Sequence, residues 1–162
     1  MTMAMAACTF VAANDISWSA DWAWGLPLIV LTVVIHVLGL GLISQRASHL
    51  SERIYERRHP TVTFVTVVGA TTLLATCLHG FEAGLWALAY RALGALPAFK
   101  SSMLYSLNAM TSYGHTDLEL PAHWHLLGAM EALNGWLLFG LSAAFLFAVI
   151  DKLWSQGRDR HR

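Results

Sequence analysis

The sequence predicts an all-α membrane protein with three transmembrane helices and a re-entrant element between the second and the third. Composition points first to a membrane: 56% of the 162 residues are apolar, 12% are charged, and the mean hydropathy is +0.52. Soluble domains hold about 25% charged residues. Three apolar stretches also approach the roughly 20 residues that a helix needs to cross a bilayer.

Charge and cysteine content exclude several other classes. The formal net charge is zero and no long basic run occurs, so nucleic acid is not an expected partner. Cys8 and Cys77 lie far apart, which indicates neither a disulfide framework nor a zinc site.

Residues 1–25 form an expected outer N-terminal segment. It contains Asp15 and Asp21 and no Lys or Arg, which argues against a cleaved signal peptide. Two interpretations stay open, a segment in the interfacial aromatic belt and a poorly ordered tail. The aromatic residues of this segment that favour the first are Trp18, Trp22 and Trp24.

Residues 26–60 are expected to hold the first transmembrane helix and a basic loop. Leu26–Ser44 carries no formal charge, and its single His36 is interpreted as a hydrogen-bonded packing residue. The loop from Gln45 to Pro60 belongs in the cytoplasm, because basic residues near membrane spans stay inside. Those residues are Arg46, Arg53, Arg57 and Arg58.

The second span begins at Thr61, is apolar to Leu78 and continues as a helix to about Gly94. Three polar or aromatic residues follow at helical spacing i, i+3 and i+7 and share one face: His79, Glu82 and Trp86. A carboxylate at membrane depth needs a partner, so one interpretation buries Glu82 and His79 in protein. The other places this stretch at the membrane interface.

The third span is His125–Ile150, and a basic cytoplasmic tail, residues 154–162, follows it. Eight of the ten Lys and Arg residues lie in the first loop or after the third span. Both counts predict an outside N-terminus and a cytoplasmic C-terminus in the cell (inner) membrane. The outer connection holds only Arg91 and Lys100.

The connection from Leu96 to His123 is too apolar for a solvated loop and too short for another crossing. Ser101–Thr111 is expected to form three helical turns whose first serines cap the helix. Irregular backbone at membrane depth must line a cavity or lie in protein, so a pore or pocket is expected. The alternative is an amphipathic helix resting on the outer surface.

Span, short helix, loop and span in this order resemble the pore domain of the potassium channel superfamily. Leu78–Leu153 carries the likeness, and the implied pore domain spans 61–153. Thr111–Asp117 aligns without gaps on the filter signature Thr-Thr-Val-Gly-Tyr-Gly-Asp, and Glu131–Ala144 resembles the inner helix. The polar face at His79 is similar to that of small prokaryotic channel-like proteins with an extra N-terminal span.

The resemblance implies a role for each filter position. Ser112 would supply the innermost hydroxyl ring, while Tyr113 takes the valine position and Gly114 that of the first glycine. His115 stands where the family has tyrosine, and Thr116 replaces the second glycine, which predicts a different backbone at the outer end. Three outcomes stay open: a selective potassium channel, a weakly selective cation pore, and a protein that no longer conducts.

The resemblance also implies residues around the filter. Asp117 and Glu119 would concentrate cations at an outer vestibule that includes His123, with metal binding the less favoured interpretation of its histidines. Gly135 or Gly140 would be the inner-helix hinge. Apart from the resemblance, buried polar support is assigned to His79, Glu82, Glu131 and Asn134. The last two could hold the pore helix in place or line the cavity, and their pairing with Glu82 or His79 is the favoured interpretation.

The resulting prediction is a cation channel subunit, not an enzyme, that works as a homotetramer in the lipid bilayer. The permeant monovalent cation, K⁺ by family resemblance, is cargo, and no resident cofactor is expected. Two alternatives are a non-conducting accessory protein and a membrane enzyme or transporter subunit that uses His79, Glu82 and Glu131.

Overall fold

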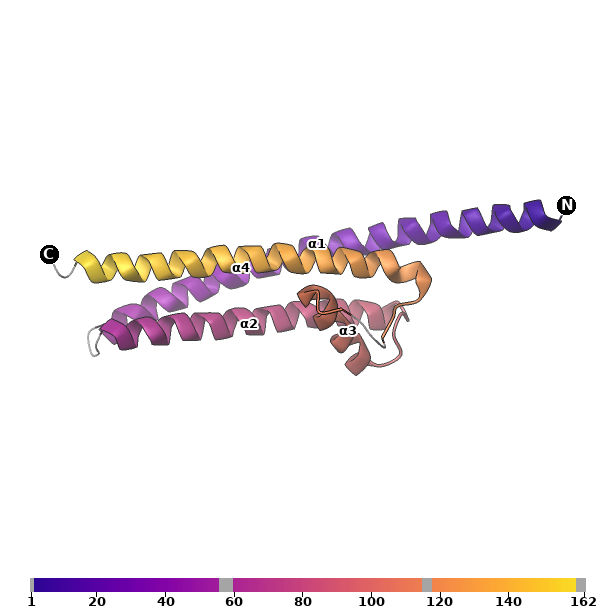
Figure 1. Ribbon diagram of the computed structural model, residues 1–162. Helices are drawn as coiled ribbons and strands as arrows, with labels where there is room; N and C mark the ends of the chain where they lie inside the picture. The colour runs from indigo at the N-terminus through magenta and orange to yellow at the C-terminus, as the bar shows by residue number, and fades with distance from the viewer. Residues whose placement is uncertain (1, 56–59, 115–117, 160–162) are drawn as a thin grey trace. The chain divides into compact units, whose positions relative to one another are not determined.

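The computed structural model describes residues 2–55, 60–114 and 118–159, with side chains at 18–49, 61–114 and 118–155. These residues form helices joined by turns and contain no strand. In chain order the elements are α1 (Thr2–Tyr55), α2 (Pro60–Ala92), α3 (Phe99–Thr111), the 3₁₀ turn η1 (Ala122–Trp124) and α4 (His125–Asp159) (Figure 1).

Three stretches are long enough and apolar enough to cross a membrane: Trp18–His49, Thr61–Ala92 and Ala122–Ser155. The prediction of an all-helical membrane protein with three such helices is therefore confirmed. Helix α1 is longer than the predicted first span, because it continues through Pro27 and over most of the expected loop to Tyr55. No Gly-Pro or Asn-Gly turn signal interrupts those flanking residues.

The described chain groups into two compact units. Unit 1 consists of Met1–Val33 and Ala83–Trp136, and unit 2 of Val34–Glu82 and Leu137–Arg162. Each of α1, α2 and α4 contributes residues to both units, whereas α3 and η1 belong to unit 1 alone.

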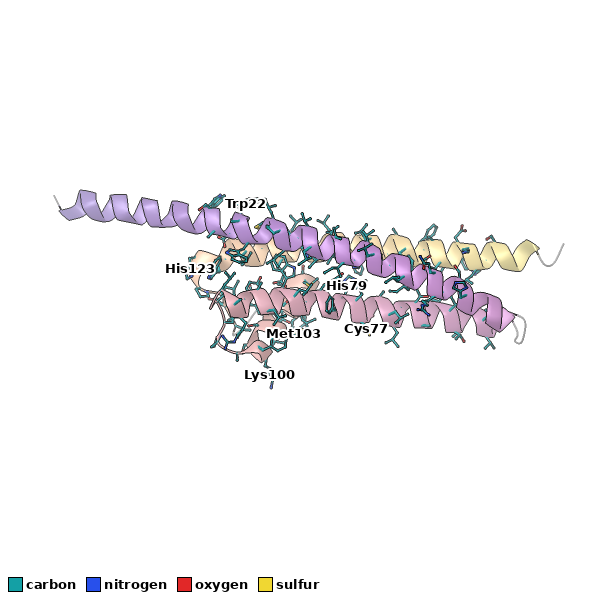
Figure 2. All side chains as sticks on the ribbon, turned by 180° about the vertical axis from the view of Figure 1, so that it is seen from behind. Trp22, Cys77, His79, Lys100, Met103 and His123 are labelled. Carbon is teal, nitrogen blue, oxygen red and sulfur yellow. The ribbon has the colours of Figure 1, made fainter. Side chains whose placement is uncertain are left out.

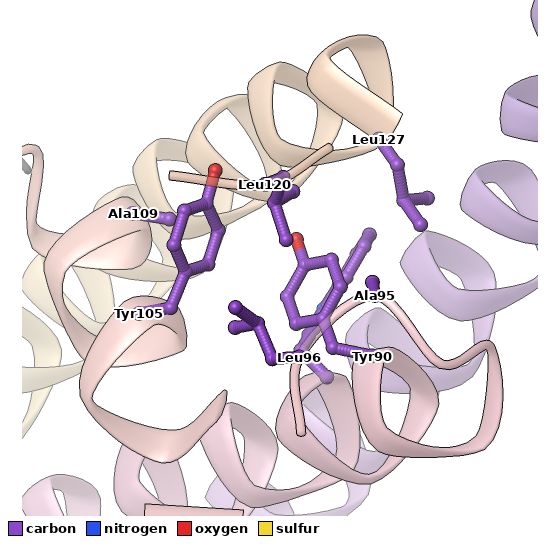
Figure 3. Close-up of a cluster of buried hydrophobic side chains, with 8 residues drawn as sticks. Tyr90, Ala95, Leu96, Tyr105, Ala109, Leu120 and Leu127 are labelled. Carbon is purple, nitrogen blue, oxygen red and sulfur yellow. The ribbon is translucent and has the colours of Figure 1, made fainter. Parts of the chain in front are cut away.

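The core of unit 1 gathers where α3 meets the end of α2 and the start of α4 (Figure 3). Tyr90 and Tyr105 meet edge to face with ring centroids 5.2 Å apart. Such aromatic pairs add about 0.5–1.5 kcal/mol beyond the area that they bury. The buried members of this cluster are Trp86, Tyr90, Ala95, Leu96, Tyr105, Ala109, Leu120 and Leu127.

Unit 2 packs the beginning of α2 against the remaining parts of α1 and α4. Phe64 stacks on Trp154 with ring centroids 6.2 Å apart, and Lys152 Nζ donates to Ser48 Oγ at 3.0 Å. Gly39 permits the close approach of Leu78, since a Cβ on Gly39 would lie 2.6 Å from Leu78 Cδ2. The buried apolar residues of this unit are Leu40, Ile43, Val67, Ala75, Leu138 and Leu153.

Three threonines in the middle of α2 hydrogen-bond within their own helix. Thr71 Oγ1 donates to the Val67 carbonyl at 2.6 Å, Thr72 Oγ1 to Val68 at 2.9 Å and Thr76 Oγ1 to Thr72 at 3.0 Å. Thr72 and Thr76 are exposed on the helix surface. Their hydroxyl groups are therefore satisfied without a partner outside the helix.

Helix α3 differs from the prediction at its start. It begins at Phe99 rather than Ser101, and Ala98 occupies the N-cap position without a side-chain hydrogen bond. The prediction of a serine cap was therefore wrong. Ser102 Oγ instead donates to the Ala98 carbonyl at 3.1 Å from within the first turn. Figure 2 shows Lys100 projecting outward beside this turn.

Candidate functional site

A buried carboxyl holds α3 in unit 1. Glu131 of α4 is fully buried, and Tyr90 of α2 donates its hydroxyl to Glu131 Oε2 at 2.6 Å. Ser106 of α3 contacts Glu131 Oε1 and also lies 2.8 Å from the Ala83 carbonyl, to which its hydroxyl donates. One carboxyl thus joins α2, α3 and α4.

The hydroxyl and carboxyl protons available at this site determine which group donates in each of these hydrogen bonds. Ser106 has one hydroxyl proton, and the Ala83 carbonyl can only accept. All contacts are satisfied when Glu131 carries a proton: Tyr90 donates to Glu131, Glu131 to Ser106, and Ser106 to Ala83. No Lys, Arg or His within the described ranges forms an ion pair with Glu131. The neutral acid therefore fits this site.

Tyr105 completes the buried face of α3. Burial raises the pKa of the Tyr105 phenol to about 12. The phenol therefore stays protonated at neutral pH. A Cβ on Gly128 would clash with its oxygen, so a glycine on α4 makes room for the phenol.

The C-terminus of α3 turns sharply into the loop that follows. The Ser112 N–H donates to the Ala109 carbonyl at 3.1 Å and the Tyr113 N–H to the Asn108 carbonyl at 3.0 Å. This pair of bonds is a Schellman motif, with Ser112 in the left-handed region at φ 54°. Glycine usually occupies that position, so Ser112 is conformationally strained.

A contact from α4 reaches the same serine. Trp136 Nε1 donates to Ser112 Oγ at 2.9 Å. The hydroxyl that the resemblance assigns to the innermost filter ring is therefore bonded to α4 in this chain. Thr111, the preceding residue, donates its own hydroxyl to the Leu107 carbonyl at 2.7 Å.

The structure describes part of the predicted filter. Tyr113 is 85% exposed, and Gly114 is exposed with φ 91°, a conformation that requires glycine. The sites predicted at His115, Thr116 and Asp117 lie outside the described residues. The loop directly after α3 thus leaves its side chains uncovered by the described part of its own chain.

The two predicted hinge glycines differ in their surroundings. A Cβ on Gly135 would lie 2.7 Å from the Met110 Cα and 2.8 Å from its carbonyl carbon, so α4 directly contacts the backbone of α3 there. Gly140 has nothing within 4 Å among the described residues. Gly135 therefore serves close packing, and bending at either position remains a prediction.

The predicted vestibule residues Glu119 and His123 are exposed. His123 lies against Trp124, with ring centroids 5.4 Å apart, and His125 Nε2 donates to the Leu120 carbonyl at 2.8 Å. Asp21 of α1 is buried and lies near both histidines and the backbone of Leu127. The positive N-terminal end of the α4 dipole stabilises a carboxylate at this position. No sequence pattern distinguished Asp21 from an ordinary interfacial residue.

A second buried carboxyl lies in unit 2, where His79, Glu82, His36 and Ser142 form a closed ring. His36 Nδ1 is 2.9 Å from Glu82 Oε1, and His79 Nδ1 is 3.5 Å from Glu82 Oε2. The opposite nitrogens meet at Ser142 Oγ, 3.1 Å from His36 Nε2 and 3.0 Å from His79 Nε2. Glu82 is therefore buried in protein and paired, as the first of the two interpretations expects.

The predicted pairing of Glu131 and Asn134 with Glu82 or His79 was also wrong. Glu131 bonds to Tyr90 and Ser106, and Asn134 Nδ2 donates to Thr32 Oγ1 at 2.8 Å. All of these partners lie in unit 1, whereas Glu82 and His79 lie in unit 2. Glu82, Glu131 and Asn134 are buried as predicted, whereas His79 is only partly covered.

No protein-family model, curated protein or solved structure matches this chain.

Proposed function

We propose that this chain is the subunit of a tetrameric cation channel, potassium-channel-like, in which the loop after α3 forms an altered selectivity filter. The supporting observation is how α3 is held. At 13 residues, or about 20 Å, α3 is too short to cross a bilayer. The hydrogen bond between Ser106 and Glu131 and the backbone contact at Gly135 attach α3 to α4.

This attachment gives the loop a defined starting point. The Schellman motif ends α3 at Thr111, and the Trp136 contact holds Ser112. After Ser112, Tyr113 and Gly114 are exposed in the described part of the chain. A carbonyl filter of the potassium channel type needs four loops around one axis. A homotetramer would supply these loops and cover the exposed residues.

The proposed orientation places the N-terminus outside and the C-terminus in the cytoplasm of the cell (inner) membrane. It follows from the distribution of basic residues and puts the filter at the outer side. Lipid, further copies of this chain and permeant monovalent cations, K⁺ first, are the partners in this proposal.

Cation flux through purified protein in liposomes tests the proposal. The vesicles carry a K⁺ or a Na⁺ gradient, and empty vesicles give the background. We expect flux above background that favours K⁺ only weakly, since Thr116 replaces a filter glycine. The variant Thr116→Gly should then raise the K⁺ to Na⁺ ratio.

Two results would count against it. An unchanged ratio in Thr116→Gly would contradict the filter alignment. Absence of flux from a verified tetramer would instead favour the accessory protein that has kept the architecture without conduction. The proposal of an enzyme or transporter subunit predicts a working monomer or dimer.

A further inference from the structure

The ring of His36, His79, Glu82 and Ser142 contains the donor set of a transition-metal site. Two imidazoles and one carboxylate suit Zn²⁺ and related divalent ions, and each of the three residues offers a ligand atom within 4.8 Å of the others. We propose that His36, His79 and Glu82 bind one divalent transition-metal ion of the Zn²⁺ class. This site involves none of the filter residues and does not depend on the proposed channel function.

The distances agree with a tetrahedral ion. Zinc lies about 2.0–2.2 Å from nitrogen and oxygen ligands, so two ligands at the tetrahedral angle are about 3.3 Å apart. The two Nδ1 atoms lie 2.9 Å and 3.5 Å from the Glu82 oxygens, on either side of that value. An ion between them would need only small shifts of the side chains. The fourth position is left for water, as in sites with three protein ligands.

Ser142 is placed as the outer partner of both histidines. A metal-bound imidazole normally donates its other N–H to a fixed acceptor. With metal on both Nδ1 atoms, both Nε2–H groups point at Ser142 Oγ, at 3.1 Å and 3.0 Å, and its two lone pairs accept them. Without a metal, the single Ser142 proton serves only one neutral ring, and the other requires an additional proton. The ion therefore completes the ring.

Burial supplies a second, independent observation. Glu82 is fully buried, and its Oε2 has no hydrogen-bond partner in the part of the chain that the structure describes. Its close contact, His79 Nδ1 at 3.5 Å, is an ion-pair contact without a hydrogen bond, and a buried carboxylate oxygen that lacks a hydrogen bond is costly. A metal ion would satisfy it. His79 is partly exposed, which gives an ion access to the ring (Figure 2 labels His79 on α2).

The consequence is a metal that connects three helices. His36 lies on α1, His79 and Glu82 on α2, and the outer partner Ser142 on α4. K⁺ prefers oxygen ligands, so imidazoles distinguish this ion from the permeant cation. The bound metal would stabilise unit 2.

Co²⁺ tests the site because its visible spectrum reports tetrahedral coordination. The full chain is purified in detergent on a tag without histidines, stripped with EDTA and titrated with Co²⁺, followed by competition with Zn²⁺. We expect one Co²⁺ per chain, intense bands between about 500 and 650 nm, displacement by Zn²⁺ and a higher Tm with Zn²⁺.

Three variants make the test specific. His79→Ala, at a partly exposed position, should weaken Co²⁺ binding more than 100-fold, and Ser142→Ala about 10- to 100-fold, as for other outer partners. His49→Ala removes an exposed histidine elsewhere on α1 and should leave the spectrum unchanged.

The proposal is overturned if the wild-type chain, which tests it without any variant, shows no tetrahedral Co²⁺ bands or binds without a defined stoichiometry. It is equally overturned if His79→Ala, folded by circular dichroism, keeps the wild-type spectrum. In either case the ring is not the metal site.

Discussion

The two buried glutamates of this chain differ in the groups that compensate the cost of burying a carboxyl. Glu82 in unit 2 lies between two imidazoles, which can supply positive charge. Glu131 in unit 1 contacts two hydroxyl groups, which cannot. A buried carboxylate is costly unless it is paired, so the partners suit an ionised Glu82 and a neutral Glu131. Burial alone therefore does not reveal which carboxyl carries charge.

Replacing each carboxyl by its amide tests this difference most directly. Glu82→Gln in metal-free protein should lower the free energy of unfolding by about 3 kcal/mol, because it leaves the buried imidazole of His36 and the partly buried one of His79 without their anion. Glu131→Gln should cost less than about 1 kcal/mol, because the amide accepts from Tyr90 and donates to Ser106 as the neutral acid does. Unfolding in mixed detergent micelles measures both. Equal losses would contradict the assigned charges.

Glycine substitutions on α4 test the second attachment of α3. Gly135→Ala places a methyl group against the Met110 backbone and should cost about 2 kcal/mol and reduce K⁺ flux. Gly140→Ala is the matched control, with open space around it and an expected change within about 0.5 kcal/mol. Similar effects of the two changes on stability and flux would argue against a packing role for Gly135.

Two serines allow the networks to be weakened separately. Ser106→Ala and Ser142→Ala should each cost about 1–2 kcal/mol, because each removes a partner of a buried group. Only Ser106 lies on α3, so only Ser106→Ala should reduce liposome flux strongly. A larger flux loss in Ser142→Ala would indicate that flux depends more on unit 2 than on the attachment of α3.

The smallest expected effect concerns the indole at the loop. Trp136→Phe removes the hydrogen bond to Ser112 and keeps an aromatic ring, so it should cost about 0.5–1 kcal/mol. Trp154→Phe, which keeps its stacking partner Phe64, is the control and should change the Tm less. A shift of the K⁺ to Na⁺ ratio only in Trp136→Phe would connect this bond to the filter.

Local sequence predicted the elements better than their partners. Hydropathy placed the three spans, and Ser101–Thr111 indicated the short helix between two of them. The partners of Glu131 and Asn134 depend on how each helix is rotated against its neighbours, which a single segment does not encode. Ser142 gave no signal either, because a lone serine in an apolar helix usually serves close packing.

The threonines of α2 have a consequence for how this segment enters a membrane. With each hydroxyl bonded to the carbonyl one turn earlier, Thr72 and Thr76 present mainly their methyl groups to the surroundings. A hydropathy scale counts these side chains as polar, although the folded helix has already satisfied them. During insertion, the first half of α2 should therefore partition into lipid more readily than its composition suggests, once it is helical.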